Sequence, residues 1–167
     1  MPKIKLEIEL IPKTCHYKNA RQKLKTSQWD TVRKYTYQAA DYACEICGLT
    51  GKEQGFKNNL EAHEVWAYNK KTLTQKLVGL IALCPLCHQT KHFGRSSKMG
   101  KQAQIFTQLE TINGWNHKQV VQHVAQCFLE CKERSQYRWS LDLSILTKAP
   151  YNLIITPKKR KKYKRKS

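Results

Sequence analysis

The chain has 167 residues, of which 31 are Lys or Arg and 12 are Asp or Glu, so its formal net charge is +19. This length predicts one domain with an appended tail, and this charge favours a polyanionic partner such as nucleic acid. No apolar run approaches a membrane span and no secretory signal is recognisable, so we expect an intracellular protein without a membrane partner. Seven cysteines, an odd number, favour metal thiolates in a reducing compartment over a disulfide framework.

The first elements are an expected strand and an expected helix. Alternating apolar residues over 3–10 predict a half-buried strand. Ser27 and Asp30 have the spacing of a helix N-terminal cap, and apolar residues follow them at helical intervals. We therefore expect a helix over 28–40.

The middle of the chain predicts two strands followed by a helix. Apolar stretches over 60–66 and 77–83 are typical of strands. A helix is expected over 85–93, because a proline stands just inside its start and a glycine follows its end. Residues 95–101 are interpreted as a basic linker.

The last part of the chain predicts two helices, a strand and a tail. The first helix is expected over 102–112, and the second starts at Asn116, where Gln119 stands three residues on in a capping arrangement. Residues 137–143 alternate and could pair with the N-terminal strand. Residues 151–167 are interpreted as a basic disordered tail, with eight basic residues and no acidic one after residue 156.

Four cysteines occur as two Cys-x-x-Cys pairs, Cys44 with Cys47 and Cys84 with Cys87. Two-residue spacing lets both thiolates of a pair reach one ion from a single turn, and two such pairs complete a closed tetrahedral site. We predict a structural Zn²⁺ here. The alternative interpretations are buried cysteines without a metal or a redox-active pair.

Three histidines can form a second, open site. His88 and His92 stand four residues apart on the expected helix, so both imidazoles face the same way. His63 lies on the expected strand before them. Three imidazoles that leave open positions on an ion are typical of a catalytic metal site.

The segments CEICG (44–48), LEAHEVW (60–66) and LVGLIALCPLCHQTKH (77–92) resemble the HNH endonuclease family. The resemblance implies an α+β fold with a ββα-metal (HNH) core framed by a four-cysteine zinc site, flanking helices and a short terminal strand pair. The flanks IPKTCHYKNAR, SQWDTVRKYTYQAA and WSLDLS look like those of small bacterial and phage proteins of this family, which implies a cytoplasmic or nucleoid protein.

This resemblance divides the chain into an N-terminal strand and helix (1–43), a zinc-framed HNH core (44–94), C-terminal helices and strand of the same domain (95–150), and the tail (151–167).

The resemblance also implies site residues and a reaction. His63, His88 and His92 would hold a catalytic divalent ion, Mg²⁺ or another, in addition to the structural zinc. The implied reaction is hydrolysis of DNA phosphodiester bonds by water activated at one metal ion, with 5′-phosphate and 3′-hydroxyl ends. Glu64 stands where the family has its general-base histidine, so the implied catalytic set is His63, Glu64 and His88; Glu64 could instead be a fourth ligand.

Two departures from the family pattern favour an alternative function. Glu64 replaces the family's basic histidine, and Gly79 stands where the family has an asparagine. A second register would make His63 the base, but Ala62 would then occupy the ligand position and cannot bind a metal. The alternative to a nuclease is a catalytically degenerate HNH-type zinc domain, which binds nucleic acid or serves as an accessory subunit of a larger nucleoprotein assembly.

DNA is the expected partner and RNA the alternative, because basic residues flank the core and fill the tail. The tail is interpreted as a nucleic-acid grip, in preference to a nuclear localisation signal or a solubilising end. The residues expected to contact nucleic acid are Arg21, Lys23, Lys91, Arg95, Lys158, Lys159, Arg160, Lys161 and Lys162.

Overall fold

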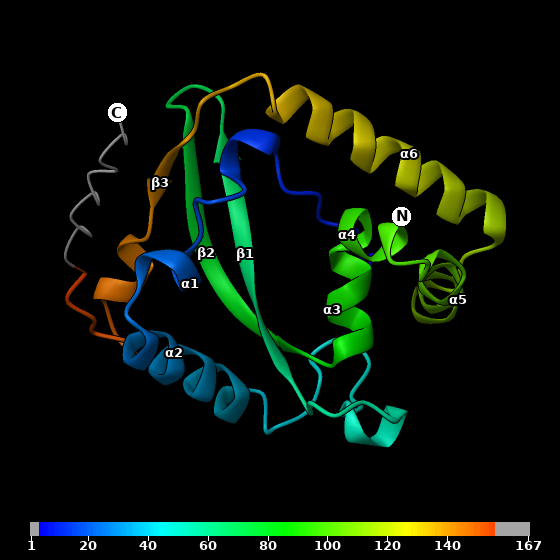
Figure 1. Ribbon diagram of the computed structural model, residues 1–167, viewed down its shortest axis with the longest axis horizontal. Helices are drawn as coiled ribbons and strands as arrows, with labels where there is room; N and C mark the ends of the chain where they lie inside the picture. Colours follow the sequence, from blue (N-terminus) through cyan, green and yellow to red (C-terminus); the bar gives the residue numbers. More distant parts are fainter. Residues whose placement is uncertain (1–3, 156–167) are drawn as a thin grey trace, which may run out of the picture.

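A long β-hairpin forms the centre of the structure, a computed structural model that describes residues 4–155 (Figure 1). Strands β1 (Glu61–Asn69) and β2 (Thr74–Leu83) pair antiparallel, and the short strand β3 (Ser140–Asp142) adds to β2 in parallel. The sheet order is β1-β2-β3. The structure thus confirms a mixed α+β fold and both central strands, although β3 pairs with β2 rather than with the N-terminal segment.

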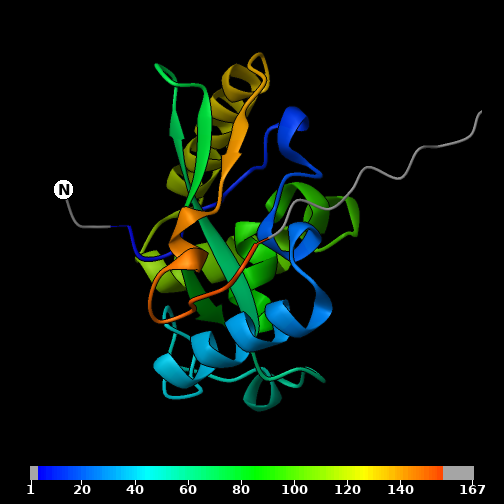
Figure 2. The same cartoon turned by 90° about the vertical axis from the view of Figure 1, so that its left-hand side faces the viewer.

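Helices pack on both sides of the hairpin (Figures 1 and 2). On one side lie α1 (Ala20–Lys23) and α2 (Thr26–Ala39). On the other side α3 follows β2 directly, and the remaining helices continue from it: α3 (Pro85–Lys91), α4 (Phe93–Lys98), α5 (Gln102–Asn113) and α6 (His117–Arg134). Short 3₁₀ turns occupy Lys13–Cys15, Lys52–Gln54 and Ser144–Thr147. Among the described residues, no helix combines the length and the apolar character that a membrane crossing requires.

Two hydrophobic clusters stabilise these two sides. The larger one joins the N-terminal segment, the end of β2 and helices α3 to α6, with Leu6, Ile8, Leu83, Ile105 and Leu109 among its buried members. The smaller one joins α1, α2, the start of β2 and the chain after β3, through Ala20, Leu24, Val32, Leu77 and Leu146. The hairpin therefore connects two packed layers, and residues that alternate along it face different surroundings.

The N-terminal segment is extended but does not form the predicted strand. Leu6 and Ile8 are buried and Lys5 and Glu7 are exposed, as alternation requires. Side chains, however, bind much of its backbone: the Lys5 and Leu6 amides donate to the Asn113 side-chain oxygen. The Ile8 amide donates to His123 Nε2, and the Glu9 amide donates to the Lys91 carbonyl. The segment therefore lies against α5, α6 and α3 without a strand partner.

Three other predictions change in detail. Helix α2 begins at Thr26, and the Lys25 amide donates to the Gln28 side chain, so the expected cap at Ser27 and Asp30 is wrong. The expected basic linker is helix α4 for most of its length. The tail begins later than predicted, because Tyr151, Leu153 and Ile155 pack against the smaller cluster; residues 156–167 lie outside the described part.

Helix α6 begins where the sequence predicts. The Gln119 amide donates to the Asn116 side chain, and the Asn116 amide donates to the Gln119 side chain. This reciprocal pair confirms the capping arrangement.

Candidate metal centres

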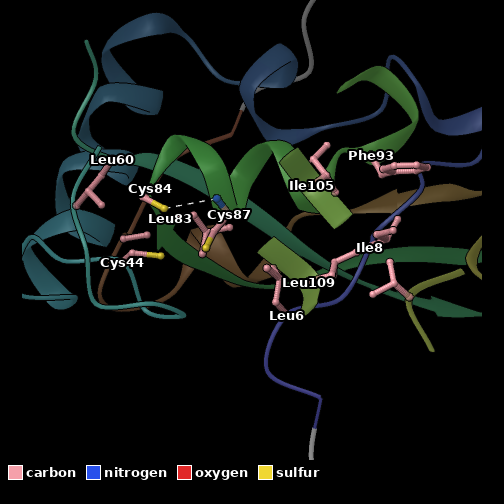
Figure 3. Close-up of a cluster of buried hydrophobic side chains, with 12 residues drawn as sticks. Leu6, Ile8, Cys44, Leu60, Leu83, Cys84, Cys87, Phe93, Ile105 and Leu109 are labelled. Carbon is pink, nitrogen blue, oxygen red and sulfur yellow. Dashed lines mark hydrogen bonds between the residues drawn. The ribbon is translucent and has the colours of Figure 1, made fainter. Parts of the chain in front are cut away.

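The four cysteines of the two Cys-x-x-Cys pairs come together at one end of the larger hydrophobic cluster. Figure 3 shows Cys44, Cys84 and Cys87 near Leu60 and Leu83, with Phe93 and Ile8 at the far end of the cluster. The four cysteine sulfur atoms all lie within 4.8 Å of one another. A tetrahedral zinc ion with Zn–S bonds of about 2.3 Å requires sulfur atoms about 3.8 Å apart. The Cys47 and Cys84 sulfur atoms are 3.6 Å apart, so the quartet could hold a metal ion such as zinc.

Hydrogen bonds and electrostatics around the sulfur atoms favour a bound cation. Hydrogen bonds from Cys84 and Cys87 lower the pKa of Cys44, whereas burial raises the pKa of Cys47 to about 12. Four thiolates cannot coexist at this spacing without a positive charge among them. The Cys87 amide and the Gln108 side chain donate to Cys84 Sγ and Cys87 Sγ, each at 3.4 Å, as donors around metal-bound sulfur do.

The three histidines also come together, as their spacing predicts. His63 projects from β1, His88 lies on α3, and His92 ends that helix. Their ring centroids are 5.4 Å apart for His63 and His88, 5.0 Å for His63 and His92, and 4.6 Å for His88 and His92. One nitrogen atom from each ring lies within 4.8 Å of the other two, so one ion could contact all three.

Two glutamates that the sequence analysis did not single out contact this triad. His63 Nε2 lies 2.8 Å from a Glu9 carboxylate oxygen, and His88 Nδ1 contacts Glu61. Carboxylates that bind the second nitrogen of an imidazole are typical partners of metal-ligating histidines. Glu61 lies two residues before His63 on β1. Residues two apart on a strand share one face, so strand alternation could have identified Glu61 from the sequence. Glu9 lies 54 residues before His63 and carries no local signal.

The surroundings of His63 and His92 favour neutral imidazoles. Burial, with repulsion from His88 and His63, lowers the pKa of His92 to about 3. Burial also lowers the pKa of His63, outweighing the opposite effect of Glu9. A neutral imidazole has one lone pair, which a metal ion can use.

One ring nitrogen of His63 and one of His88 are also free in a way that suits metal binding. His63 Nδ1 is buried and has no hydrogen-bond partner, one of only two such side-chain atoms among the described residues. A buried nitrogen without a partner is costly, and a metal ion would remove that cost. On His88, the contact of Nδ1 with Glu61 leaves Nε2 for a metal.

Glu64 does not converge with the three histidines, so its expected role as base or fourth ligand has no support from the geometry. Neighbouring residues of a strand point to opposite faces, so Glu64 projects away from His63. Its Oε1 accepts hydrogen bonds from the amides of Ala20 at 2.7 Å and Arg21 at 3.1 Å. Burial raises the pKa of Glu64, and its position attaches the start of α1 to the sheet.

We therefore expect substitutions of Glu64 to change stability and not metal binding. Glu64→Ala leaves two backbone amides without their acceptor and should lower the free energy of unfolding in urea by about 1–3 kcal/mol. Glu64→Gln keeps an acceptor oxygen and should be close to wild type in stability and in metal binding at the histidine triad. A stable Glu64→Gln protein that no longer binds a metal at the triad would restore Glu64 as a ligand.

The basic residues predicted to contact nucleic acid divide into three groups. Arg21, Lys23 and Arg95 are exposed and available for such contacts. Lys91 is 5% exposed and its Nζ lies 2.5 Å from a Glu9 oxygen, so its prediction as a surface contact is wrong. The other five, Lys158, Lys159, Arg160, Lys161 and Lys162, lie outside the described residues.

A wide cleft of about 2720 Å³ passes the histidine triad. His63, His88 and His92 line it, together with exposed basic side chains that include Lys57, Arg95 and Lys98. A positively charged cleft beside a candidate metal site favours anionic ligands.

Comparisons with protein-family models, with curated proteins and with solved structures find no match to this chain.

Proposed function

We propose that this protein is an HNH-type nuclease that hydrolyses phosphodiester bonds of DNA at a divalent metal held by His63, His88 and His92. The observation that carries the proposal is the convergence of three imidazoles, from β1 and the end of α3, beside a cysteine quartet that could hold zinc. In this proposal β1, β2 and α3 are a ββα-metal core, and the quartet is its structural zinc site. The exposed lysines and arginines of the cleft would hold the phosphate backbone.

The chain's residues support the chemistry in defined ways. The bound ion would polarise a phosphoryl oxygen and lower the pKa of a water molecule. Hydrolysis adds that water across the bond between phosphorus and the 3′ oxygen, leaving a 5′-phosphate on one product and a protonated 3′-hydroxyl on the other. Three imidazoles without a carboxylate ligand suit Ni²⁺, Zn²⁺ or Co²⁺ better than Mg²⁺. We therefore expect activity to be stronger with such ions than with Mg²⁺.

A second candidate function is a nucleic-acid-binding module that does not cut. The orientation of Glu64 favours it, because the family's base position then faces away from the metal. The hydrogen bond from His88 lowers the pKa of Glu61, and His63 and Lys91 outweigh burial to lower the pKa of Glu9. Carboxylates of low pKa are weak bases, so water activation would depend on the metal alone.

Plasmid nicking separates these two functions. Zinc-loaded protein is incubated with supercoiled plasmid and Ni²⁺, Mn²⁺ or Mg²⁺. We expect His88→Ala to reduce nicking by about 100-fold or more, because it removes a metal ligand. His117→Ala should cut like wild type, because His117 lies on the surface at the start of α6. Retardation of DNA in a gel without nicking under any metal would refute the nuclease and favour the binding module.

A further inference from the structure

We propose that Glu9, held by Lys91, is a positioning residue that fixes the proton of His63 on Nε2 and so presents the Nδ1 lone pair to the metal. This inference rests on the proposed function, because it concerns the same histidine triad. It assigns a role in metal binding to the N-terminal segment, which lies outside the hairpin and helix that carry the three histidines.

The first step of the argument is the contact between Glu9 and His63. The two side chains are 2.8 Å apart, between a Glu9 oxygen and His63 Nε2. His63 is only 3% exposed, and its imidazole must be neutral to ligate a metal. A carboxylate can only accept hydrogen bonds, so the neutral ring must donate through Nε2–H. Its lone pair then lies on Nδ1, the buried atom without a partner.

The second step is the way in which Glu9 itself is held. Its other carboxylate oxygen lies 2.5 Å from Lys91 Nζ, and its backbone amide donates to the Lys91 carbonyl at 2.8 Å. Leu6 and Ile8 beside it are buried in the larger cluster. Because a metal-ligating His63 is neutral, Lys91 is the cation that balances the Glu9 charge. The carboxylate is thus fixed by α3, the same helix that carries His88.

The third step is the effect of replacing Glu9 with glutamine. Glu9→Gln keeps the shape of the side chain but leaves one acceptor oxygen for two donors. The Lys91 ammonium has only donors, so it should take the oxygen and leave the glutamine amide facing His63. That amide donates to Nε2, which would move the imidazole proton to Nδ1 and block the atom that binds the metal.

The test measures the imidazole proton and metal affinity separately. Protein with ¹⁵N-labelled histidine and a loaded cysteine quartet is examined by long-range ¹H–¹⁵N NMR without metal at the triad. We expect His63 to carry its proton on Nε2 in wild type and on Nδ1 in Glu9→Gln. Titration with Ni²⁺ by calorimetry should then give a dissociation constant about 10- to 100-fold weaker in Glu9→Gln.

Two further variants make the test specific. Glu7→Gln removes the same charge from an exposed position on the same segment, and it should change neither measurement. Glu9→Leu with Lys91→Met leaves no acceptor for His63 and no lone buried charge, so it is the folded alternative if Glu9→Gln is unstable. It should give a mixture of both His63 tautomers and a smaller loss of Ni²⁺ affinity than Glu9→Gln, because part of the population keeps the Nδ1 lone pair.

The outcomes distinguish this inference from the proposed function. An unchanged His63 proton and unchanged Ni²⁺ affinity in Glu9→Gln would overturn the role of Glu9. If wild type binds no Ni²⁺, or if the Ni²⁺ that it binds is still bound by His88→Ala, the triad is not a metal site. The proposed function then fails. The NMR measurement would still decide whether Glu9 sets the form of His63.

Discussion

A Cys84→Ser variant should lose both the zinc that we expect the cysteine quartet to bind and its cooperative unfolding transition. Cys84 is fully buried between the end of β2 and the first residue of α3. Its sulfur accepts the Cys87 amide, and together with Cys44 and Cys47 it joins the chain after α2 to the turn between β2 and α3. A metal there would connect segments that are about 40 residues apart along the chain.

The binding free energy of a structural zinc ion is comparable to the free energy of unfolding of a whole domain. Structural zinc contributes roughly 10–16 kcal/mol of apparent binding free energy in small zinc domains, whereas domains are typically stable by about 5–15 kcal/mol. Residues 50–59 contain one large apolar residue, Phe56, so this loop has little else to hold it. Loss of the metal would also displace α3, which carries His88, and we therefore expect Ni²⁺ binding at the triad to be lost too.

Zinc content by mass spectrometry and thermal unfolding check this prediction together. Wild type should contain one tightly held zinc per chain. Cys127→Ser is a suitable control, because Cys127 is a half-buried residue of α6 outside the quartet, and it should keep its zinc. A Cys84→Ser protein that retains one equivalent of zinc, or unfolds at the wild-type temperature, would contradict a structural metal site.

The cysteine quartet and the histidine triad could be predicted because their signals are local. Each Cys-x-x-Cys pair fits within one turn, and His88 and His92 share a helix face whatever the rest of the fold does. The meeting of the two cysteine pairs and the approach of His63 required tertiary structure. The hairpin supplies the second by pairing His63 with Ile81 near the start of α3.

The opposite orientation of Glu64 could also have been predicted. Adjacent strand residues cannot both face one ion in regular geometry, and His63 and Glu64 precede the register shift between Val65 and Trp66. The family resemblance placed Glu64 at the base position by its order in the sequence. Strand geometry places it on the other face, where it binds backbone amides.

The N-terminal segment could not be predicted correctly, because alternation reports which side chains are buried and not what binds the backbone. Leu6 and Ile8 are buried as the pattern requires. Their amides are bound by Asn113 and His123, more than 100 residues later in the chain. The contact between Glu9 and Lys91 likewise joins residues that are 82 apart in the chain. Nothing in the sequence around Lys91 therefore distinguishes it from a surface lysine.

Lys91→Met should lower the free energy of unfolding by about 3 kcal/mol, the second-largest effect that we expect. Lys91 is 5% exposed, and among residues 4–155 it is the only lysine or arginine that forms an ion pair with the Glu9 carboxylate. Removing one partner of a buried ion pair leaves the other charge uncompensated and costs roughly 3–5 kcal/mol. The lower end of that range applies because a quarter of the Glu9 side chain is exposed.

Urea unfolding of zinc-loaded proteins measures this effect, and two variants define its cause. Lys98→Met removes an equal charge from an exposed position on α4 and should change stability by less than about 0.5 kcal/mol. Glu9→Gln combined with Lys91→Met removes both charges, so it should recover at least half of the loss through the coupling of the two sites. A Lys91→Met protein of wild-type stability with weakened DNA binding would instead restore Lys91 as a surface contact.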